Sequence, residues 1–123
     1  MKENLIAAKT YQFAISIINL GKGLINEKEY ILSRQILKSG TSIGANVEEA
    51  IGGISKKDFR AKMSIAYKEA RETHYWLKLL RDTNYITHEE FNSLEKELLS
   101  ILEYYLKLFN HPKNNNKSHI IHH

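Results

Sequence analysis

Residues 91–109 read FNSLEKELLSILEYYLKLF, and their apolar positions decide the fold class. One set of side chains is separated alternately by three and four residues, the heptad spacing of helices that pack side by side: Phe91, Leu94, Leu98, Ile101, Tyr105 and Leu108. A second set widens this face to about half of the helix circumference: Leu99, Leu102, Leu106 and Phe109. A face this wide needs more than one neighbouring helix, which favours a bundle over a two-stranded coiled coil.

Three further segments with helical periodicity precede this one. The breaks between them are Gly21 and Gly23, Gly52-Gly53 and Asp82-Thr83-Asn84, and His111-Pro112 ends the last segment. We expect helices at about residues 4–20, 27–51, 55–81 and 87–109. Ser55 with Asp58, and Thr87 with Glu90, have the spacing of helix N-caps. The prediction is an all-α, antiparallel up-down-up-down four-helix bundle at residues 1–110, followed by a mobile tail at 111–123.

Three of these helices have a recognisable apolar face. In the first, Leu5, Ala8, Ile15 and Ile18 recur at helical spacing, with Tyr11, Ala14 and Ile17 beside them. In the second, the apolar face carries Leu32, Ile36, Ile43, Val47 and Ala50. In the third, we assign one face to the core: Phe59, Met63, Ala66, Ala70, Thr73, Leu77 and Leu80.

Length and composition exclude several classes of protein. A chain of 123 residues usually forms one domain. The chain has no cysteine, so disulfides, thiolate metal sites and cysteine nucleophiles are excluded. No apolar run approaches the length of a membrane span, and Met1-Lys2-Glu3-Asn4 lacks the layout of a signal peptide. We therefore expect a cytoplasmic protein with no membrane contact.

A polar row lies beside the apolar face of the second segment. It consists of Gln35, Ser39, Ser42 and Asn46, with Gly40 and Gly44 on the neighbouring flank. Small residues permit close helix approach, and buried polar groups need partners. A tight helix crossing with satisfied hydrogen bonds explains the row best; a ligand or catalytic site, or plain solvent exposure, is the alternative. We expect Glu69 or Glu72 to hydrogen-bond to this row across the bundle.

The same segment carries a family resemblance. Leu32-x-x-Gln35-Ile36-x-Lys38-Ser39-x-x-Ser42-Ile43-x-Ala45-Asn46-Val47-x-Glu49 resembles the second-helix signature of the four-helix-bundle proteins encoded in 23S rRNA intervening sequences. Ala50 stands where that family usually has glycine. Lys57-x-Phe59, Ala66, Lys68 to Thr73 and Trp76-Leu77 are similar to its third helix, and Tyr85-Ile86 to the turn before its fourth. The resemblance covers about residues 5–109.

This resemblance implies an antiparallel four-helix bundle that forms a homo-oligomer. Related members include the accessory protein of diversity-generating retroelements, which is similar to a basic pentameric barrel that binds nucleic acid and a reverse transcriptase. A homopentamer with a nucleic-acid or protein partner is therefore implied. Family membership does not fix a biological role, because many members lie outside any intervening sequence.

The charge of the chain is unevenly distributed. The net charge of +4 combines a basic third helix with an acidic fourth one. Residues 55–81 hold eight basic and three acidic side chains, whereas residues 82–110 hold two basic and six acidic ones. On the helical wheel the basic residues of the third helix share one arc, a stripe about 40 Å long: Lys56, Lys57, Arg60, Lys68, Arg71, Lys78 and Arg81, with Tyr67, His74 and Tyr75 interleaved.

A stripe of one charge sign with aromatic side chains suits a nucleic-acid backbone. Lysine and arginine neutralise phosphates, and Tyr67 can stack on an exposed base. A solvated face, or ion pairs with acids of the fourth helix within or between subunits, explains the stripe equally well, and a lipid or other anion is a third alternative. No base-reading motif is present, so binding to RNA or DNA is expected to be non-specific or directed by shape.

Catalytic and metal chemistry have weak support. Four of the six histidines lie in or beside the tail, and His74 and His88 have no histidine or Glu-x-x-His partner at metal-binding spacing. Ser42 has no recognisable histidine base, and the chain lacks a phosphate-binding glycine loop. An enzyme that used Glu72 and the polar row would need a concave pocket with a strongly perturbed carboxylate. We expect no catalytic site, metal or cofactor.

Aromatic surface supports self-association. Tyr75, Trp76, Tyr104 and Tyr105 exceed what a small bundle core absorbs easily, and the apolar face of the fourth helix is wide. The leading interpretation is a non-catalytic, oligomeric module that binds nucleic acid through the basic stripe. The alternative is a protein-interaction scaffold, such as a reverse-transcriptase accessory subunit, whose charges serve assembly.

Overall fold

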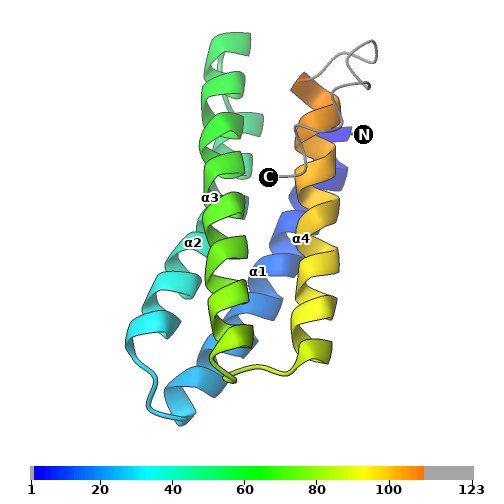
Figure 1. Cartoon of the computed structure of the whole chain (residues 1–123). Helices are drawn as coiled ribbons and strands as arrows, with labels where there is room; N and C mark the ends of the chain where they lie inside the picture. Colours follow the sequence, from blue (N-terminus) through cyan, green and yellow to red (C-terminus); the bar gives the residue numbers. More distant parts are fainter. Residues whose placement is uncertain (1, 110–123) are drawn as a thin grey trace.

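The computed structural model describes residues 2–109, with side chains from residue 5 onward, and every regular element in that range is an α-helix. The helices are α1 (Lys2–Asn26), α2 (Ile31–Ile51), α3 (Lys56–Asp82) and α4 (His88–Phe109). Successive helices alternate in direction (Figure 1). The predicted all-α up-down-up-down bundle is thus confirmed. The predicted tail at 111–123 lies outside the described residues.

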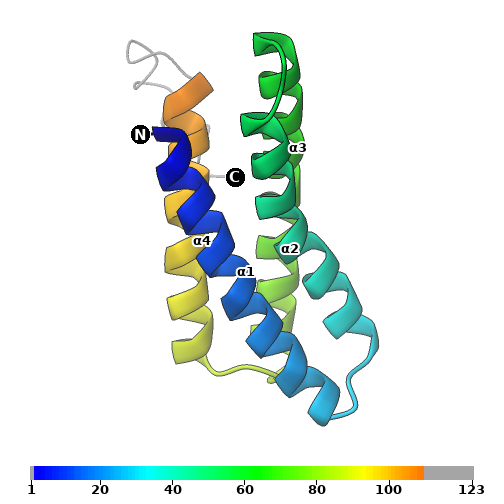
Figure 2. The same ribbon diagram turned by 180° about the vertical axis from the view of Figure 1, so that it is seen from behind.

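The four helices occupy the corners of a closed bundle. Both α2 and α4 pack against α1 and against α3, and the α2–α3 contact is the most extensive of these. This pattern places α1 and α3 at opposite corners of the bundle, and Figure 2 shows the same arrangement from behind. Each helix therefore turns one side inward, two flanks toward its neighbours and one side outward.

Side-chain caps fix the starts of α3 and α4, and a glutamate just before α2 bonds to its first turn. Ser55 Oγ accepts a hydrogen bond from the Asp58 amide at 3.1 Å. Thr87 Oγ1 accepts from the Glu90 amide at 3.0 Å while Glu90 Oε1 accepts from the Thr87 amide at 2.8 Å, which confirms both predicted caps. Helix α2 begins at Ile31, later than expected, and Glu29 Oε1 accepts from the first-turn amides of residues 32 and 33.

The expected end of the first helix near residue 20 is wrong, because α1 continues through Gly21 and Gly23 to Asn26. A Cβ at Gly21 would lie 2.6 Å from Leu37 of α2. Glycine here serves close helix packing, and its cost of about 1 kcal/mol within a helix does not stop the helix. The turn comes instead at Lys28, which has a φ of 66°.

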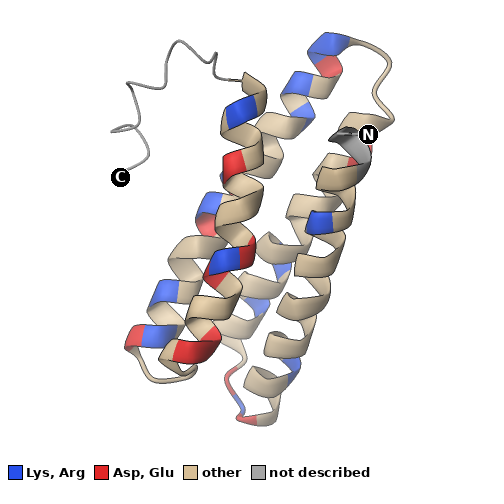
Figure 3. Cartoon of the chain, turned by 90° about the vertical axis from the view of Figure 1, so that its right-hand side faces the viewer, with Lys and Arg blue, Asp and Glu red and all other residues tan. Residues whose placement is uncertain are grey.

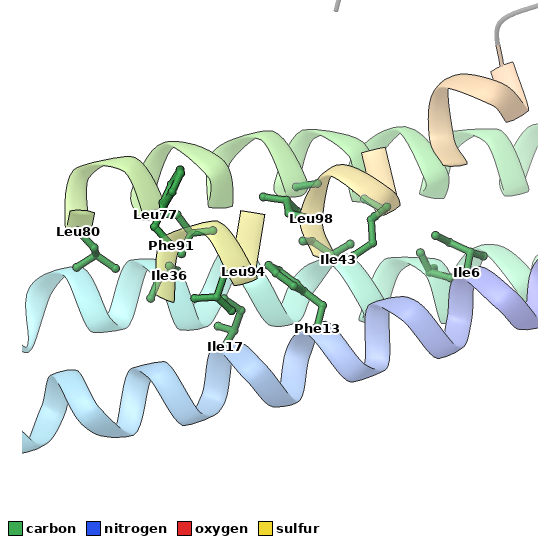
Figure 4. Close-up of a cluster of buried hydrophobic side chains, with 14 of the residues drawn as sticks. Ile6, Phe13, Ile17, Ile36, Ile43, Leu77, Leu80, Phe91, Leu94 and Leu98 are labelled. Carbon is green, nitrogen blue, oxygen red and sulfur yellow. The ribbon is translucent and has the colours of Figure 1, made fainter. Parts of the chain in front are cut away.

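The core lies between all four helices (Figure 4). The apolar residues of α2 and α3 behave as predicted, except that Leu32 and Phe59 are only partly buried. In α4 the first four heptad positions are buried, whereas Leu108 is exposed. In α1 the buried side chains are Ile6, Thr10, Phe13, Ile17 and Leu24. The periodic set picked out by the sequence lies largely on the outer side, with Leu5, Tyr11, Ile15 and Ile18 exposed.

Candidate nucleic-acid interface

Six basic side chains are exposed along α3, and we call them the basic face: Lys56, Lys57, Arg60, Lys68, Arg71 and Lys78. Figure 3 shows basic segments at intervals along the length of α3, with acidic segments on α4. A regular helix of 27 residues holds its two ends about 40 Å apart. The basic face thus forms an extended surface, not a compact pocket.

Among the described side chains, no cation of the basic face forms an ion pair. The ion pairs between described side chains are Lys62–Glu49 at 3.0 Å, His74–Glu95 at 2.8 Å, Arg81–Asp82 at 2.7 Å and Lys107–Glu103 at 3.7 Å. None of these involves the basic face. The acids of α4 that form ion pairs thus pair with His74 and with their own helix, so the intrasubunit ion-pair alternative loses support.

Arg81 differs from the other predicted cations. Its Nε–H donates to Asp82 Oδ1 at 2.7 Å, and its guanidinium lies 4.3 Å from the centroid of the Phe91 ring. This hydrogen bond lowers the pKa of Asp82. Arg81 is therefore held by two partners and has only a quarter of its side chain, 25 %, exposed. It is the least available of the predicted phosphate contacts.

Aromatic rings and guanidinium groups form a column along the seam between α3 and α4. Tyr67 stacks on Tyr105 with centroids 4.2 Å apart, and Tyr105 contacts Phe109 at 4.6 Å. Arg60 lies 4.8 Å from the Phe109 ring and Arg71 lies 6.0 Å from the Tyr67 ring, distances that permit cation–π attraction. Two cations of the basic face thus lie over rings of this column. Tyr67 is half-buried in it.

The sequence did not predict this column. The residues that it adds, Tyr105 and Phe109, belong to the predicted apolar face of the fourth helix. Their separation of four residues puts them on one side of α4, which is the available signal. Their meeting with Tyr67 and Arg60 depends on how α3 and α4 pack, which a helical wheel of either helix alone does not contain.

Three members of the polar row of α2 form short hydrogen bonds, and one of these bonds reaches α3. Ser39 is buried, and its Oγ accepts from Thr73 Oγ1 of α3 at 2.8 Å. Ser42 Oγ donates to the Lys38 carbonyl at 2.7 Å and Asn46 Nδ2 to the Ser42 carbonyl at 2.8 Å, so both bond within α2. Gln35 is half-buried beside them. Ser39 thus makes the row's hydrogen bond to α3, while Ser42 and Asn46 are satisfied within α2.

The predicted cross-helix partner of this row is corrected from Glu69 or Glu72 to Thr73. Glu72 is exposed, and its Oε2 accepts from Trp76 Nε1 at 3.0 Å on the same helix. Burial and then the neighbouring Glu72 charge raise the pKa of Glu69, while Lys38 lowers it. The shorter threonine reaches Ser39 because it lies on the inner side of α3, whereas both glutamates lie further round the helix.

The Ser39–Thr73 pair yields a stability prediction. Thr73→Val leaves the Ser39 hydroxyl buried without its donor, and we expect a loss of about 1–2 kcal/mol in the free energy of unfolding. Ser39→Ala with Thr73→Val removes both polar groups and should cost less than the two single changes added together. Urea denaturation of the wild type, Ser39→Ala, Thr73→Val and the double variant measures this coupling. Additive losses would show that the hydrogen bond contributes no coupling.

The interior offers little room for a substrate. A cavity between α1, α2, α3 and α4 is lined by side chains such as Ile6, Val47, Met63 and Tyr67, and encloses about 10 Å³. This is about the space of one water molecule, and no carboxylate lines it.

In residues 2–109, no three His, Asp or Glu side chains gather closely enough to hold a metal ion. Nor does any helix of this range combine the length and apolarity of a membrane span.

The comparisons with known proteins agree with this architecture. The family model described as "23S rRNA-intervening sequence protein" matches residues 2–105. A protein of unknown function from the S23 ribosomal protein family of Bacteroides thetaiotaomicron is 48% identical in sequence to this chain. Its crystal structure superimposes on this one with a TM-score of 0.85. The match covers 88% of this chain and 97% of that one. A comparison with curated proteins gives no match. The chain therefore belongs to the 23S rRNA-intervening sequence protein family.

Proposed function

We propose that this protein is a non-catalytic, oligomeric helical module that binds nucleic acid non-specifically through the basic face of α3. The observation that carries the proposal is the set of six exposed cations without an acidic partner in the described chain. Unpaired cations along a rigid helix neutralise successive phosphates and release their counterions, which supplies affinity without base recognition. Arg60 and Arg71 lie over rings of the aromatic column along the same seam, which supports the proposal.

A salt-dependent titration tests this proposal. Fluorescently labelled RNA and DNA, each single- and double-stranded, are titrated with the full chain between 50 and 300 mM salt. Replacing Lys56, Arg60, Arg71 and Lys78 by alanine removes four phosphate contacts. The affinity should fall roughly tenfold or more, and the slope of log K against log salt should flatten by about four.

A matched control removes the same charge from elsewhere. Alanine at Arg34, Lys38, Lys96 and Lys107 takes four exposed cations from α2 and α4 and leaves α3 intact. This variant should retain most of the affinity and the slope. Equal losses in both variants would mean that net charge, not the basic face, drives binding. No binding at 50 mM salt would overturn the proposal.

A protein-interaction scaffold is the second candidate function. Exposed apolar side chains on the outer side of α1 favour it, with Tyr11 70% and Ile18 41% exposed. The proposed homo-oligomer, a pentamer by the family resemblance, would cover such a surface. If the α3 cations serve assembly instead of nucleic acid, the fourfold α3 alanine variant sediments as a smaller species. Sedimentation velocity of that variant separates the two functions.

A further inference from the structure

The outer side of α1 is an apolar stripe with heptad spacing. We define it by residues that face away from the bundle and are separated by four, three, four and three positions: Tyr11, Ile15, Ile18, Lys22 and Ile25. One flank of this stripe contacts α4, because Lys9 donates a hydrogen bond to Ser100 and Ser16 donates one to Glu97. Lys22 is the one charged residue among the five members of the stripe. Residues 5–26 contain no acidic side chain that could neutralise it within α1.

The outer side of α3 repeats this spacing. Its members are Ala61, Ile65, Lys68, Glu72 and Tyr75, all of them exposed. The neighbouring positions are used inside the bundle, since Tyr67 and His74 contact α4 and Thr73 contacts α2. Each residue of the α3 stripe has a number fifty higher than its counterpart in the α1 stripe, so the two stripes align without a gap.

Aligned in parallel, the two stripes complement one another. Equivalent positions meet in parallel helix packing. Lys22 then faces Glu72, the large Tyr11 faces the small Ala61, and Ile15 faces Ile65. Ile25 faces Tyr75, and Ile18 lies along the aliphatic stem of Lys68, whose ammonium group extends to the edge. The single charge of the α1 stripe thus meets the single acid of the α3 stripe.

The fold allows every copy to use both stripes. Helices α1 and α3 run in the same direction and lie at opposite corners of the bundle (Figure 1). Copies in one common orientation can therefore place α1 of each against α3 of the next, a head-to-tail arrangement that closes into a ring when the rotation permits. Specific interfaces bury about 1,200 Å² or more in total, and a ring gives every copy two such interfaces.

We propose that the outer stripe of α1 docks in parallel on the outer stripe of α3 of a second copy, with Lys22 paired to Glu72 across the interface. This inference rests on the proposed oligomerisation and names the surfaces that produce it. The partner is a second copy because both halves of the complementary pattern are present on this one chain. Lys68 then belongs to the basic face and to the rim of the interface at once.

Charge reversal tests the pairing. The mass of the full chain is measured by light scattering and sedimentation for the wild type, Lys22→Glu, Glu72→Lys and the double variant. Each single reversal puts like charges together and should weaken association at least tenfold. The double variant restores opposite charges and should recover the wild-type mass. Arg34→Glu and Glu48→Lys, on α2 and outside both stripes, should leave the mass unchanged.

The outcomes separate the two proposals. A wild-type monomer at 100 μM overturns oligomerisation itself. A wild-type oligomer that tolerates both single reversals, or a double variant that fails to recover, overturns only the α1–α3 pairing. Because Glu72 also bonds to Trp76, thermal melts check folding, and Ile65→Glu provides a second interface variant that leaves this bond intact. Dissociation of that variant supports the pairing, and an unchanged oligomer contradicts it.

Discussion

Phe13→Ala is expected to lower the free energy of unfolding by about 3–5 kcal/mol, the range of phenylalanine deletions in packed cores. Phe13 has no exposed surface, and its ring points into the interior from the middle of α1 (Figure 4). The core cluster that contains Phe13 is built from all four helices, so we expect that the space left by the ring does not collapse fully. Urea denaturation monitored by circular dichroism measures the loss.

Leu5→Ala is the matched control on the same helix. Leu5 is 51% exposed, so its truncation should change the free energy of unfolding by less than about 1 kcal/mol. It also lies outside the outer stripe of α1, so the proposed docking of a second copy does not complicate the comparison. Similar losses from Phe13→Ala and Leu5→Ala would show that α1 is rotated about its axis relative to this structure.

This contrast marks the limit of sequence-based prediction for α1. Two apolar arcs run along that helix, and both have helical periodicity. Periodicity identifies an apolar arc but does not say which arc faces the core when a helix has two. In α2, α3 and α4 a single arc dominates, and there the predicted core residues, such as Ile43, Leu77 and Leu98, are buried.

The candidate interface divides in the same way. The cations of α3 could be placed on one arc because their positions depend only on the turn of one helix. Their pairing could not be predicted, since it depends on which α4 side chains reach them. Glu95 forms its ion pair with His74 and not with a lysine, and the Arg60 guanidinium lies over the Phe109 ring. Such contacts are tertiary, and neither helix encodes them by itself.

The glycines show how packing overrides local propensity. Gly21 and Gly23 predict a helix end by their conformational entropy, yet α1 continues through both. A helix boundary is set by the sum of local cost and tertiary gain, and in α1 the contact with α2 outweighs the cost. The glycines of the α1–α2 crossing should therefore respond to substitution according to their space, not to their helix propensity.

Gly40→Ala is expected to destabilise the bundle by about 1–3 kcal/mol, in spite of the better helix propensity of alanine. A Cβ at this position would lie 2.8 Å from Cγ2 and 3.2 Å from Cβ of Ile17 on α1. Ile17 is fully buried, so it cannot swing aside, and α1 would have to move away from α2. Denaturation in urea gives the size of the loss.

Gly23→Ala supplies the opposite expectation from the same kind of change. A Cβ there meets no atom within 4 Å, so alanine should stabilise the chain by up to about 1 kcal/mol. Stabilisation by both substitutions would mean that α1 and α2 lie further apart than the structure has them. Because Gly40 packs on the buried Ile17, their contact favours the rotation of α1 in which Ile15 and Lys22 face outward, the side that the proposed docking uses.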